Sequence, residues 1–392
     1  MEKSFEIKKS LLITLTAIGI LGILLSLLGV YTNNQGAASL WSSVLLNAYF
    51  VTAITAGCAF FVLVHNLADS GWHTVLVRIP ESIATFFPVA GLLMLLILLG
   101  LGDIYHWTHP QGDALLEAKT PFLNTPFFII RLIIYYLLWS LMFLKIWQQS
   151  KKMDNDNSPV IYKNLKRLSG VFIVLFVSTF YFASIDWIMT IDPHWYSSLF
   201  GFFLLSGAVV MGVAAIIIIL IVAQHFGYFQ HVKTNHLHDL GKYLFGFSIF
   251  WGYLWGSQYL LIWYSNIPEE SVYYVERLTH FPELLRLSVV LSFIVPLMGL
   301  MTAGSKKNKT WLLIMAIVVL VGQWINLYVA VKPGSTGENA SINLFDIGTL
   351  MLFVSLLAYV TFRSLTKIKQ VPINHPFMHE ALIEELSEGE HH

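Results

Sequence analysis

The stretch that decides the fold is FGFFLLSGAVVMGVAAIIIILIVA, residues 200–223, in which no side chain is charged. Its length matches the roughly 20 residues that a helix needs to cross a hydrocarbon core about 30 Å thick. Because a helix satisfies its own backbone hydrogen bonds, apolar blocks of this length indicate an all-α integral membrane protein. The ten predicted spans are 11–31, 41–64, 80–102, 126–148, 168–190, 196–224, 241–264, 285–303, 311–331 and 345–366.

The composition of the 392-residue chain agrees with this prediction. Hydrophobic residues make up 56% of it, charged residues only 12%, and the mean hydropathy is +0.67. A soluble domain carries about 25% charged residues. The 23 Lys and Arg residues balance the 23 Asp and Glu residues, which excludes a basic nucleic-acid-binding protein and a highly charged disordered one. Cys58 is the only cysteine, so an intrachain disulfide is excluded too.

The distribution of cations predicts the orientation. With the N-terminus in the cytoplasm, the cytoplasmic segments hold 18 of the 23 Lys and Arg residues and the outer segments hold five. Cytoplasmic loops retain such an excess of cations. We therefore predict that both termini are cytoplasmic, with a transmembrane domain of residues 1–373 and an acidic cytoplasmic tail of residues 374–392.

The spans also suggest an internal repeat. The second span ends in Val64-His65-Asn66 and the sixth in Gln224-His225-Phe226, and a polar segment follows each. Parallel repeats of this kind occur in membrane carriers. We predict two four-helix bundles, made of spans 2–5 and 6–9, which spans 1 and 10 flank.

Polar and ionisable residues in or beside the spans are the candidate functional residues, because a charge costs about 2.5–3.5 kcal/mol at a helix centre. They form an outer group, a middle group and a cytoplasmic group. The members are Asp186, Asp192 and His194; Gln258 and Tyr259; and His65, Asp69, Arg78, Glu81, Asp239 and Lys242. Acids, imidazoles and hydroxyls in this order suit a proton path, although turn capping and local ion pairs use the same residues.

We predict no metal or redox cofactor within the chain. A transmembrane haem needs histidines that project from facing helices deep in the membrane. Here His65, His106, His194, His225 and His280 sit at span ends or in loops. A single cysteine cannot hold an iron–sulfur cluster, and no acid or cysteine spacing favours zinc.

Two segments resemble a known family. They are SIDWIMTIDPHWYSSLFG, residues 184–201, and QYLLIWYSNIPEE, residues 258–270. Together with Asp239-Leu240-Gly241-Lys242, they are similar to the ActF-type membrane subunit of alternative complex III. That complex is the bacterial quinol:cytochrome c, or quinol:electron-acceptor, oxidoreductase. Its membrane subunits are related to the NrfD-like membrane anchors of polysulfide reductases.

The resemblance implies a ten-helix, non-redox subunit in the bacterial inner (cytoplasmic) membrane, which scaffolds a quinol-oxidising complex and provides a proton path. It also implies an ActC-type membrane subunit, multihaem and monohaem cytochromes c, an iron–sulfur subunit and a terminal cytochrome oxidase as partners. Haem c, iron–sulfur clusters and quinol, namely menaquinol, would then belong to the complex and not to this chain.

Two alternatives stay open. One is a stand-alone secondary transporter, although Pro88 and Pro296 do not occupy equivalent spans of the two halves, as broken transporter helices would. The other is that this subunit carries its own quinol site at the outer face, near Arg131, Trp187 and Trp195.

Overall fold

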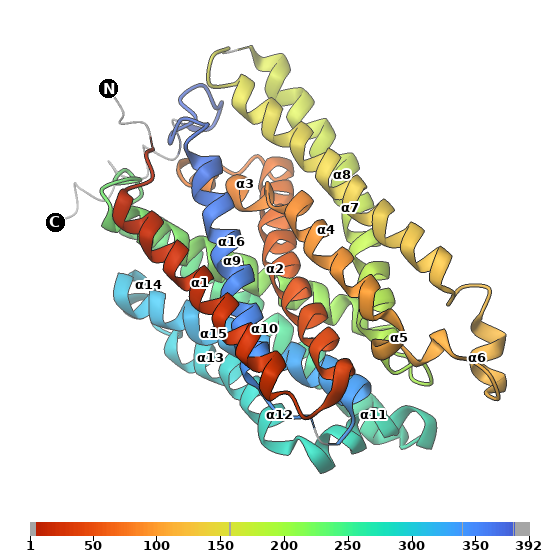
Figure 1. The fold of residues 1–392 in the computed structure, drawn as a ribbon. Coiled ribbons are helices and arrows are strands. Elements are labelled where there is room, and N and C mark those ends of the chain that lie inside the picture. Colours follow the sequence, from red (N-terminus) through yellow and green to blue (C-terminus); the bar gives the residue numbers. More distant parts are fainter. Residues whose placement is uncertain (1–4, 157, 339, 379, 381–392) are drawn as a thin grey trace.

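The computed structural model describes residues 5–156, 158–338, 340–378 and 380. These residues form helices, turns and loops but no strand (Figure 1). Nine helical runs among them are long and apolar enough to cross a membrane. The prediction of an all-α, multi-pass membrane protein is thereby confirmed. The runs are α1 (Lys9–Thr32), α2 (Gly36–Leu67), α3–α5 (Arg78–Ile104), α7 (Thr125–Lys152), α8 with η4 (Pro159–Ile191), α9 (Phe200–His225), α12–α13 (Pro282–Gly299), α15 (Lys309–Thr336) and α16 (Leu344–Leu365).

Two of these runs are interrupted. The first consists of α3 (Arg78–Ala84), α4 (Phe87–Leu95), the 3-10 turn η2 (Leu96–Gly100) and α5 (Leu101–Ile104). The second consists of α12 (Pro282–Val289), the π-helical turn η5 (Val290–Ile294) and α13 (Val295–Gly299). Pro296 has no N–H to donate to the carbonyl of Ser292, four residues earlier. A wider turn at this point accommodates the missing bond.

One long helix is not among the nine. Helix α10 (Thr234–Ser265) has 32 residues, as many as α2, but its Trp, Tyr, Gln and Ser residues lower its hydropathy. The remaining elements are short, and all of them except η4, which ends the run of α8, lie outside the nine runs. They are η1 (Trp72–Val75), η3 (His106–Thr108), α6 (Ala114–Lys119), η4 (Met189–Ile191), α11 (Pro268–His280) and α14 (Ala303–Lys307).

The long helices pack in two rings of neighbours. In the first ring, α2 and α7 each pack against both α4 and α8. In the second ring, α9 packs against α10 and α15, and the α12–α13 run packs against both of these. Helices α2 and α9 join the rings at a crossing of Gly57 and Gly212. A Cβ atom on Gly57 would lie 1.9 Å from the carbonyl oxygen of Ala208, so only glycine fits there.

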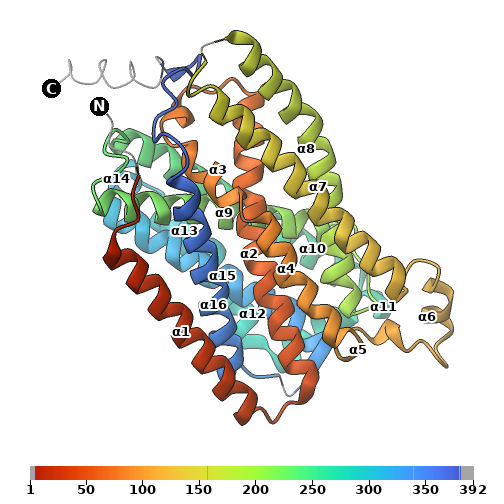
Figure 2. The same ribbon diagram turned by 45° about the horizontal axis from the view of Figure 1, so that its top comes forward.

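Helices α1 and α16 pack along each other beside the rings, as Figures 1 and 2 show. Gly22 and Gly29 of α1 and Gly348 of α16 allow their backbones to touch, since a Cβ on Gly29 would lie 2.3 Å from the backbone nitrogen of Phe345. Most of the apolar surface of α1 is exposed, in contrast to the buried α2 and α9. Lipid would cover such a surface.

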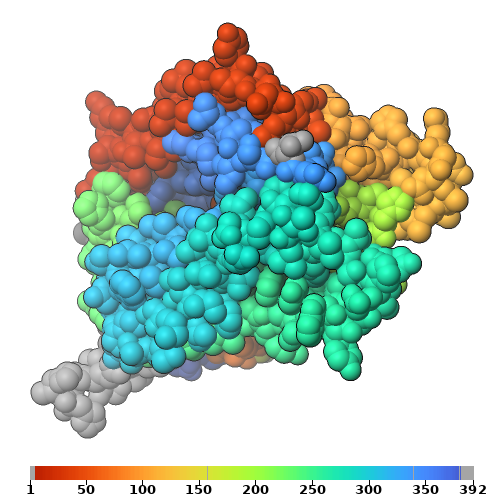
Figure 3. Space-filling view, turned by 90° about the horizontal axis from the view of Figure 1, so that it is seen from below, coloured from red at the N-terminus to blue at the C-terminus, as the bar shows by residue number. Residues whose placement is uncertain are grey.

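The loops gather at two ends of the molecule. At one end, which we call the basic end, Phe5 contacts Tyr228 and Phe362, and Lys369 donates to the carbonyl of Asp154. The opposite end contains α6, η4 and α11, and the lobe with α6 projects from it in Figure 3. Which of the two ends faces the cytoplasm stays a prediction from the distribution of cations. Residues 379 and 381–392 of the predicted acidic tail lie outside the described residues.

Candidate functional site: buried charges near both ends of the helices

Asp186, in the last turn of α8, forms a buried ion pair with Arg131 of α7. Arg131 Nε donates to Asp186 Oδ2 at 2.7 Å, and Tyr135 OH donates to the same oxygen at 3.0 Å. Among the described residues, Asp186 Oδ1 and Arg131 Nη2 are buried without a hydrogen-bond partner. The rings of Phe122 and Phe127 lie 4.0 and 4.4 Å from the guanidinium and shield it from solution. One carboxylate oxygen thus stays open to a water molecule or a proton.

Buried hydroxyl groups continue from this ion pair into the first ring. Tyr49 OH and Ser184 Oγ are 2.9 Å apart, and Thr52 Oγ1 and Tyr136 OH are 2.7 Å apart. All four side chains are buried. Trp187 stacks on Tyr136 with ring centroids 5.4 Å apart and fills the space between the pairs. Hydroxyls both donate and accept, so these groups can relay a proton with intervening water.

Arg78 and Glu81 of α3 form a second buried charged group, at the basic end. Arg78 Nη1 donates to Glu81 Oε2 at 3.0 Å and to Ser150 Oγ at 2.6 Å, while Nη2 pairs with Asp154. Arg78 and Glu81 are 0% and 1% exposed. Burial raises the pKa of Asp154, in the loop before α8, although the guanidinium opposes this rise. Two carboxylates therefore share one arginine.

Three histidines meet beside this group. The ring centroid of His73, in η1, lies 4.8 Å from that of His65 of α2 and 6.1 Å from that of His375 in the C-terminal segment. Burial lowers the pKa of His375 to about 4, and burial with the two neighbouring imidazoles lowers the pKa of His73 well below its usual value. Both are neutral near pH 7. No group of three His, Cys, Asp or Glu in the described part of the chain is arranged to hold a metal ion.

The other predicted residues of the basic end form separate surface contacts. Asp69 pairs with Lys166 and accepts a hydrogen bond from Tyr162 OH at 2.8 Å, and these two bonds lower its pKa. Asp239 pairs with Lys242 at 2.5 Å within α10. The predicted cytoplasmic group is therefore divided among four contacts, of which those around Arg78 and His65 are deeply buried.

A further ion pair lies at the opposite end. Arg277 of α11, 1% exposed, donates through Nη2 to Asp192 Oδ2 at 2.7 Å. It also donates to the carbonyls of Val329 at 3.0 Å and Ala330 at 3.3 Å. Pro333, inside α15, has no N–H to bond to the Val329 carbonyl. Arg277 replaces that missing donor, which lets α15 continue to Thr336.

A cavity of about 510 Å³ lies beside the ion pair of Arg277 and Asp192. Its walls come from the η4 loop, α11 and the end of α15, and they include His106, Asp192, His194, Trp195 and Glu276. Burial raises the pKa of Glu276. His194 lies at the rim, more than half exposed, with its Nε2 2.9 Å from Asp113 Oδ2. This cavity faces the opposite end and does not reach Asp186.

The three residues of the predicted quinol site are not brought together. Trp195 stacks on Tyr273 at 4.0 Å and lines both the large cavity and a second one of about 250 Å³. Phe122, whose ring covers Arg131, lines the second cavity. Trp187 is 0% exposed and packed among aromatic rings. Neither Arg131 nor Trp187 lines a cavity described here.

Gln258 and Tyr259 lie in the second ring and not between the two buried charged groups. Gln258 lines a shallow cavity of about 360 Å³ at the opposite end, with Tyr196 and Glu270. Tyr259 stacks on Trp255 with ring centroids 5.5 Å apart. These two side chains therefore lie apart from the hydroxyls of the first ring.

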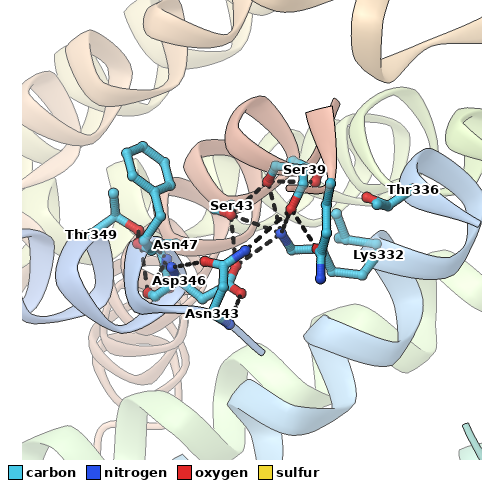
Figure 4. Close-up of polar contacts among 12 residues, drawn as sticks. Ser39, Ser43, Asn47, Lys332, Thr336, Asn343, Asp346 and Thr349 are labelled. Carbon is cyan, nitrogen blue, oxygen red and sulfur yellow. Dashed lines mark hydrogen bonds and ion pairs between the residues drawn. The ribbon is translucent and has the colours of Figure 1, made fainter. Parts of the chain in front are cut away.

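Among the described residues, the most completely buried ion pair joins Lys332 of α15 to Asp346 of α16, at 2.9 Å with both side chains 0% exposed. Lys332 Nζ also donates to Ser39 O and Ser43 Oγ of α2, both at 2.8 Å (Figure 4). Ser43 Oγ donates to Asp346 Oδ1 at 2.6 Å, and the backbone N–H of Asn343 donates to Oδ2 at 2.9 Å. Sequence reasoning placed Lys332 in a loop and so missed this pair. The sequence signal for this pair is a lysine, Lys332, at the end of an apolar span, with an acid, Asp346, in the first turn of the next helix.

The sequence matches no model of a protein family and no curated protein. The functional assignment therefore depends on the geometry above and on the resemblance of the quoted segments.

Proposed function

We propose that this chain is a non-redox subunit of a quinol-oxidising respiratory complex in the bacterial inner membrane and that its first ring conducts protons. One observation carries the proton path: Glu81 and Asp186 are buried carboxylates near opposite ends of the same four-helix ring, and each is held by an arginine. Buried ionisable groups in membrane proteins mark ion or proton routes by default, because burying them is costly.

The path runs from Arg78 and Glu81 through the hydroxyls of the first ring to Asp186. Thr52 and Tyr136 form the inner pair and Tyr49 and Ser184 the outer pair. Ordered water completes the connections, since protein side chains alone do not join the pairs. Asp239, Lys242, Gln258 and Tyr259 are not assigned to this path, because they belong to the second ring.

The fold proposed for the whole chain has ten spans, with α10 as the tenth. Its length and its place in the second ring, between the basic end and the opposite end, support this. The first and second rings are then the two predicted four-helix bundles, and α1 and α16 flank them. The basic end would face the cytoplasm, as the excess of cations there predicts.

The complex supplies the redox chemistry in this proposal. Haem c, iron–sulfur clusters and the quinol, menaquinol, are assigned to an ActC-type subunit, cytochromes c, an iron–sulfur subunit and a terminal oxidase. The support is the resemblance of residues 184–201 and 258–270 to the ActF-type subunit.

Co-purification tests the respiratory assignment first. The chain is tagged at its C-terminus, its native membranes are extracted in mild detergent, and its partners are identified by mass spectrometry. Multihaem cytochrome c, an iron–sulfur protein and an ActC-type subunit are expected. Recovery of the folded chain alone in good yield would contradict the assignment and favour a transporter.

Proton-to-electron stoichiometry of the assembled complex in liposomes tests the path. Asp186→Asn and Glu81→Gln are each expected to lower the stoichiometry while the complex still assembles. The matched control is Glu283→Gln, since Glu283 pairs with Arg286 on the surface and its side chain is 82% exposed. An unchanged stoichiometry in both path variants would exclude this route.

An outer quinol site in this chain is the second candidate, and the cavity of about 250 Å³ beside Trp195 favours it. A quinone analogue should then protect Tyr196, which lines the same cavity and is 66% exposed, from oxidative labelling, whereas the buried Trp251 serves as the unreactive reference. Equal labelling of Tyr196 with and without the analogue would argue against the site.

A further inference from the structure

The start of α10 and the short helix α14 bring cations together at the basic end. Gly241 lies so close to α14 that a Cβ atom there would be 2.9 Å from the Cβ of Lys306. His238, on the preceding turn of α10, lies within electrostatic range of Lys242, Lys306 and Lys307. We call His238, Lys242, Lys306 and Lys307 the α10–α14 basic cluster.

Lys306 differs from the other buried cations of the described chain. Arg78, Arg131, Arg277 and Lys332 each pair with a carboxylate. Lys306, only 7% exposed, donates instead to two main-chain carbonyls, those of Met301 at 3.2 Å and Thr302 at 3.3 Å. No carboxylate among the described residues pairs with it.

Burial and the nearby ammonium of Lys242 lower the pKa of Lys306. Its Nζ lies 5.0 Å from the centroid of the Phe245 ring, a cation–π contact that favours the ammonium but supplies no counter-ion. Among the residues that the structure describes, Asp239 is the carboxylate beside the cluster, and it already pairs with Lys242 at 2.5 Å. The cluster therefore has an excess of positive charge that an external anion would relieve.

An apolar surface borders the cluster. Met298 of α13 and Met301 are 67% and 57% exposed, and Trp311 at the start of α15 donates through Nε1 to the Gly299 carbonyl. Helices α13, α14 and α15 lie at one margin of the molecule in Figure 1. In a membrane-spanning chain such exposed apolar side chains face lipid. Cations next to them lie at the height of the lipid headgroups.

We propose that the α10–α14 basic cluster binds the phosphate of an anionic phospholipid, whose acyl chains lie along Met298 and Met301. A free phosphate ion would use the same lysines but would gain nothing from the two methionines. The site is independent of the proton path and of the respiratory assignment. It predicts that this edge of the protein prefers phosphatidylglycerol to phosphatidylcholine, which carries the same phosphate but no net charge.

Native mass spectrometry of the full-length chain in detergent tests the proposal. The protein is incubated with phosphatidylglycerol or phosphatidylcholine, and the lipid that it retains is counted. The wild type should retain the anionic lipid preferentially. Since each lysine near an anionic headgroup changes binding about fivefold, Lys306→Gln/Lys307→Gln should lower its retention about 25-fold. Lys307→Gln alone removes an exposed side chain and should lower it about fivefold without disturbing the fold.

The matched control is Lys163→Gln/Arg167→Gln, which removes two exposed cations of α8 at the same end. It should retain the lipid as the wild type does. Equal losses in the control and cluster variants would overturn the site, because general surface charge would then explain the binding. If millimolar inorganic phosphate stabilised the protein as much as the lipid does, the lipid assignment would be overturned. It would also be overturned if the protein preferred the anionic lipid only in the variant Glu384→Gln/Glu385→Gln. The acidic tail of the chain would then be the occupant of the cluster.

Discussion

Replacing Lys332 by methionine would leave the Asp346 carboxylate without its counter-ion inside the protein. Methionine matches the length of the lysine stem, so the variant removes the charge and its hydrogen bonds but leaves little empty space. The ammonium has three partners: Asp346 Oδ1 at 2.9 Å, and Ser39 O and Ser43 Oγ at 2.8 Å. Removing one partner of a buried pair typically costs 3–5 kcal/mol, because the remaining charge is unpaired in a low dielectric. We expect Lys332→Met to lower the free energy of unfolding by about 4 kcal/mol.

The double variant Lys332→Met/Asp346→Asn distinguishes the charge from the packing. Asparagine still accepts the hydrogen bond from the N–H of Asn343, and no charge is left buried. Replacing a buried pair by neutral groups is often neutral or stabilising. We expect the double variant within about 1 kcal/mol of the wild type, so adding Asp346→Asn to Lys332→Met should recover about 3 kcal/mol of the free energy of unfolding.

Titration with SDS from a mild detergent, followed by tryptophan fluorescence, measures these free energies. The control pair is Glu283 and Arg286, whose side chains are 82% and 67% exposed although they lie 2.9 Å apart. Exposed pairs contribute at most about 1 kcal/mol, so Arg286→Met should change little. If Lys332→Met also changes stability by less than 1 kcal/mol, the reasoning is refuted, because water must then reach the pair.

Three further predictions follow from the contacts described above. Arg277→Lys keeps the charge but loses the forked guanidinium that donates to the Val329 and Ala330 carbonyls. Amide hydrogen exchange in residues 331–336, measured by mass spectrometry, should therefore accelerate at least tenfold. Gly57→Leu places a side chain where the Ala208 carbonyl lies and should abolish the monodisperse peak in size-exclusion chromatography, whereas Gly256→Leu, with nothing within 4 Å, should keep it. His375 has a pKa of about 4 in the folded protein against about 6.5 when unfolded, so its contribution to stability is present above pH 6.5 and is lost as the pH falls toward 4. The protection factors of residues 371–378, which compare the observed exchange with the intrinsic rate at each pH, should therefore be lower at pH 5 than at pH 7.5. The difference should be smaller in His375→Gln.

The spans and the grouping of loops could be predicted because they depend on local composition. The predicted span 196–224 is close to α9 (Phe200–His225), and the loops alternate between the two ends as the cation count requires. Helix α15 continues beyond the predicted span 311–331 to Thr336, although Pro333 cannot donate a backbone hydrogen bond within it. Arg277, more than 50 residues away, supplies the missing donors. That compensation is a tertiary contact, which a pattern within one segment cannot reveal.

The same limit applies to the candidate site. Arg78 and Glu81 could be grouped from sequence because they lie three apart on one helix, but their partner Asp154 comes from another loop. Asp186 and Arg131 were each noticed as buried ions, yet assigned to different sites, because the pairing of α7 with α8 was not known. The sequence singled out Gln258 because an amide is conspicuous in an apolar helix, and the structure places it in the second ring. A hydroxyl such as that of Thr52 is less conspicuous, because it can donate a hydrogen bond to a carbonyl of its own helix.

The two buried ion pairs near the opposite end differ in how fully they are satisfied, and this difference separates their roles. Around Lys332 and Asp346, all three protons of the ammonium and both carboxylate oxygens have partners. A proton could bind to this carboxylate only if one of these hydrogen bonds were broken. The pair therefore suits a structural role, in which it holds α16 against α2 and α15. Asp186 Oδ1 and Arg131 Nη2 have no partner among the described residues. An open oxygen beside a fixed positive charge can accept a water or a proton without dismantling its site, which a conducting group requires.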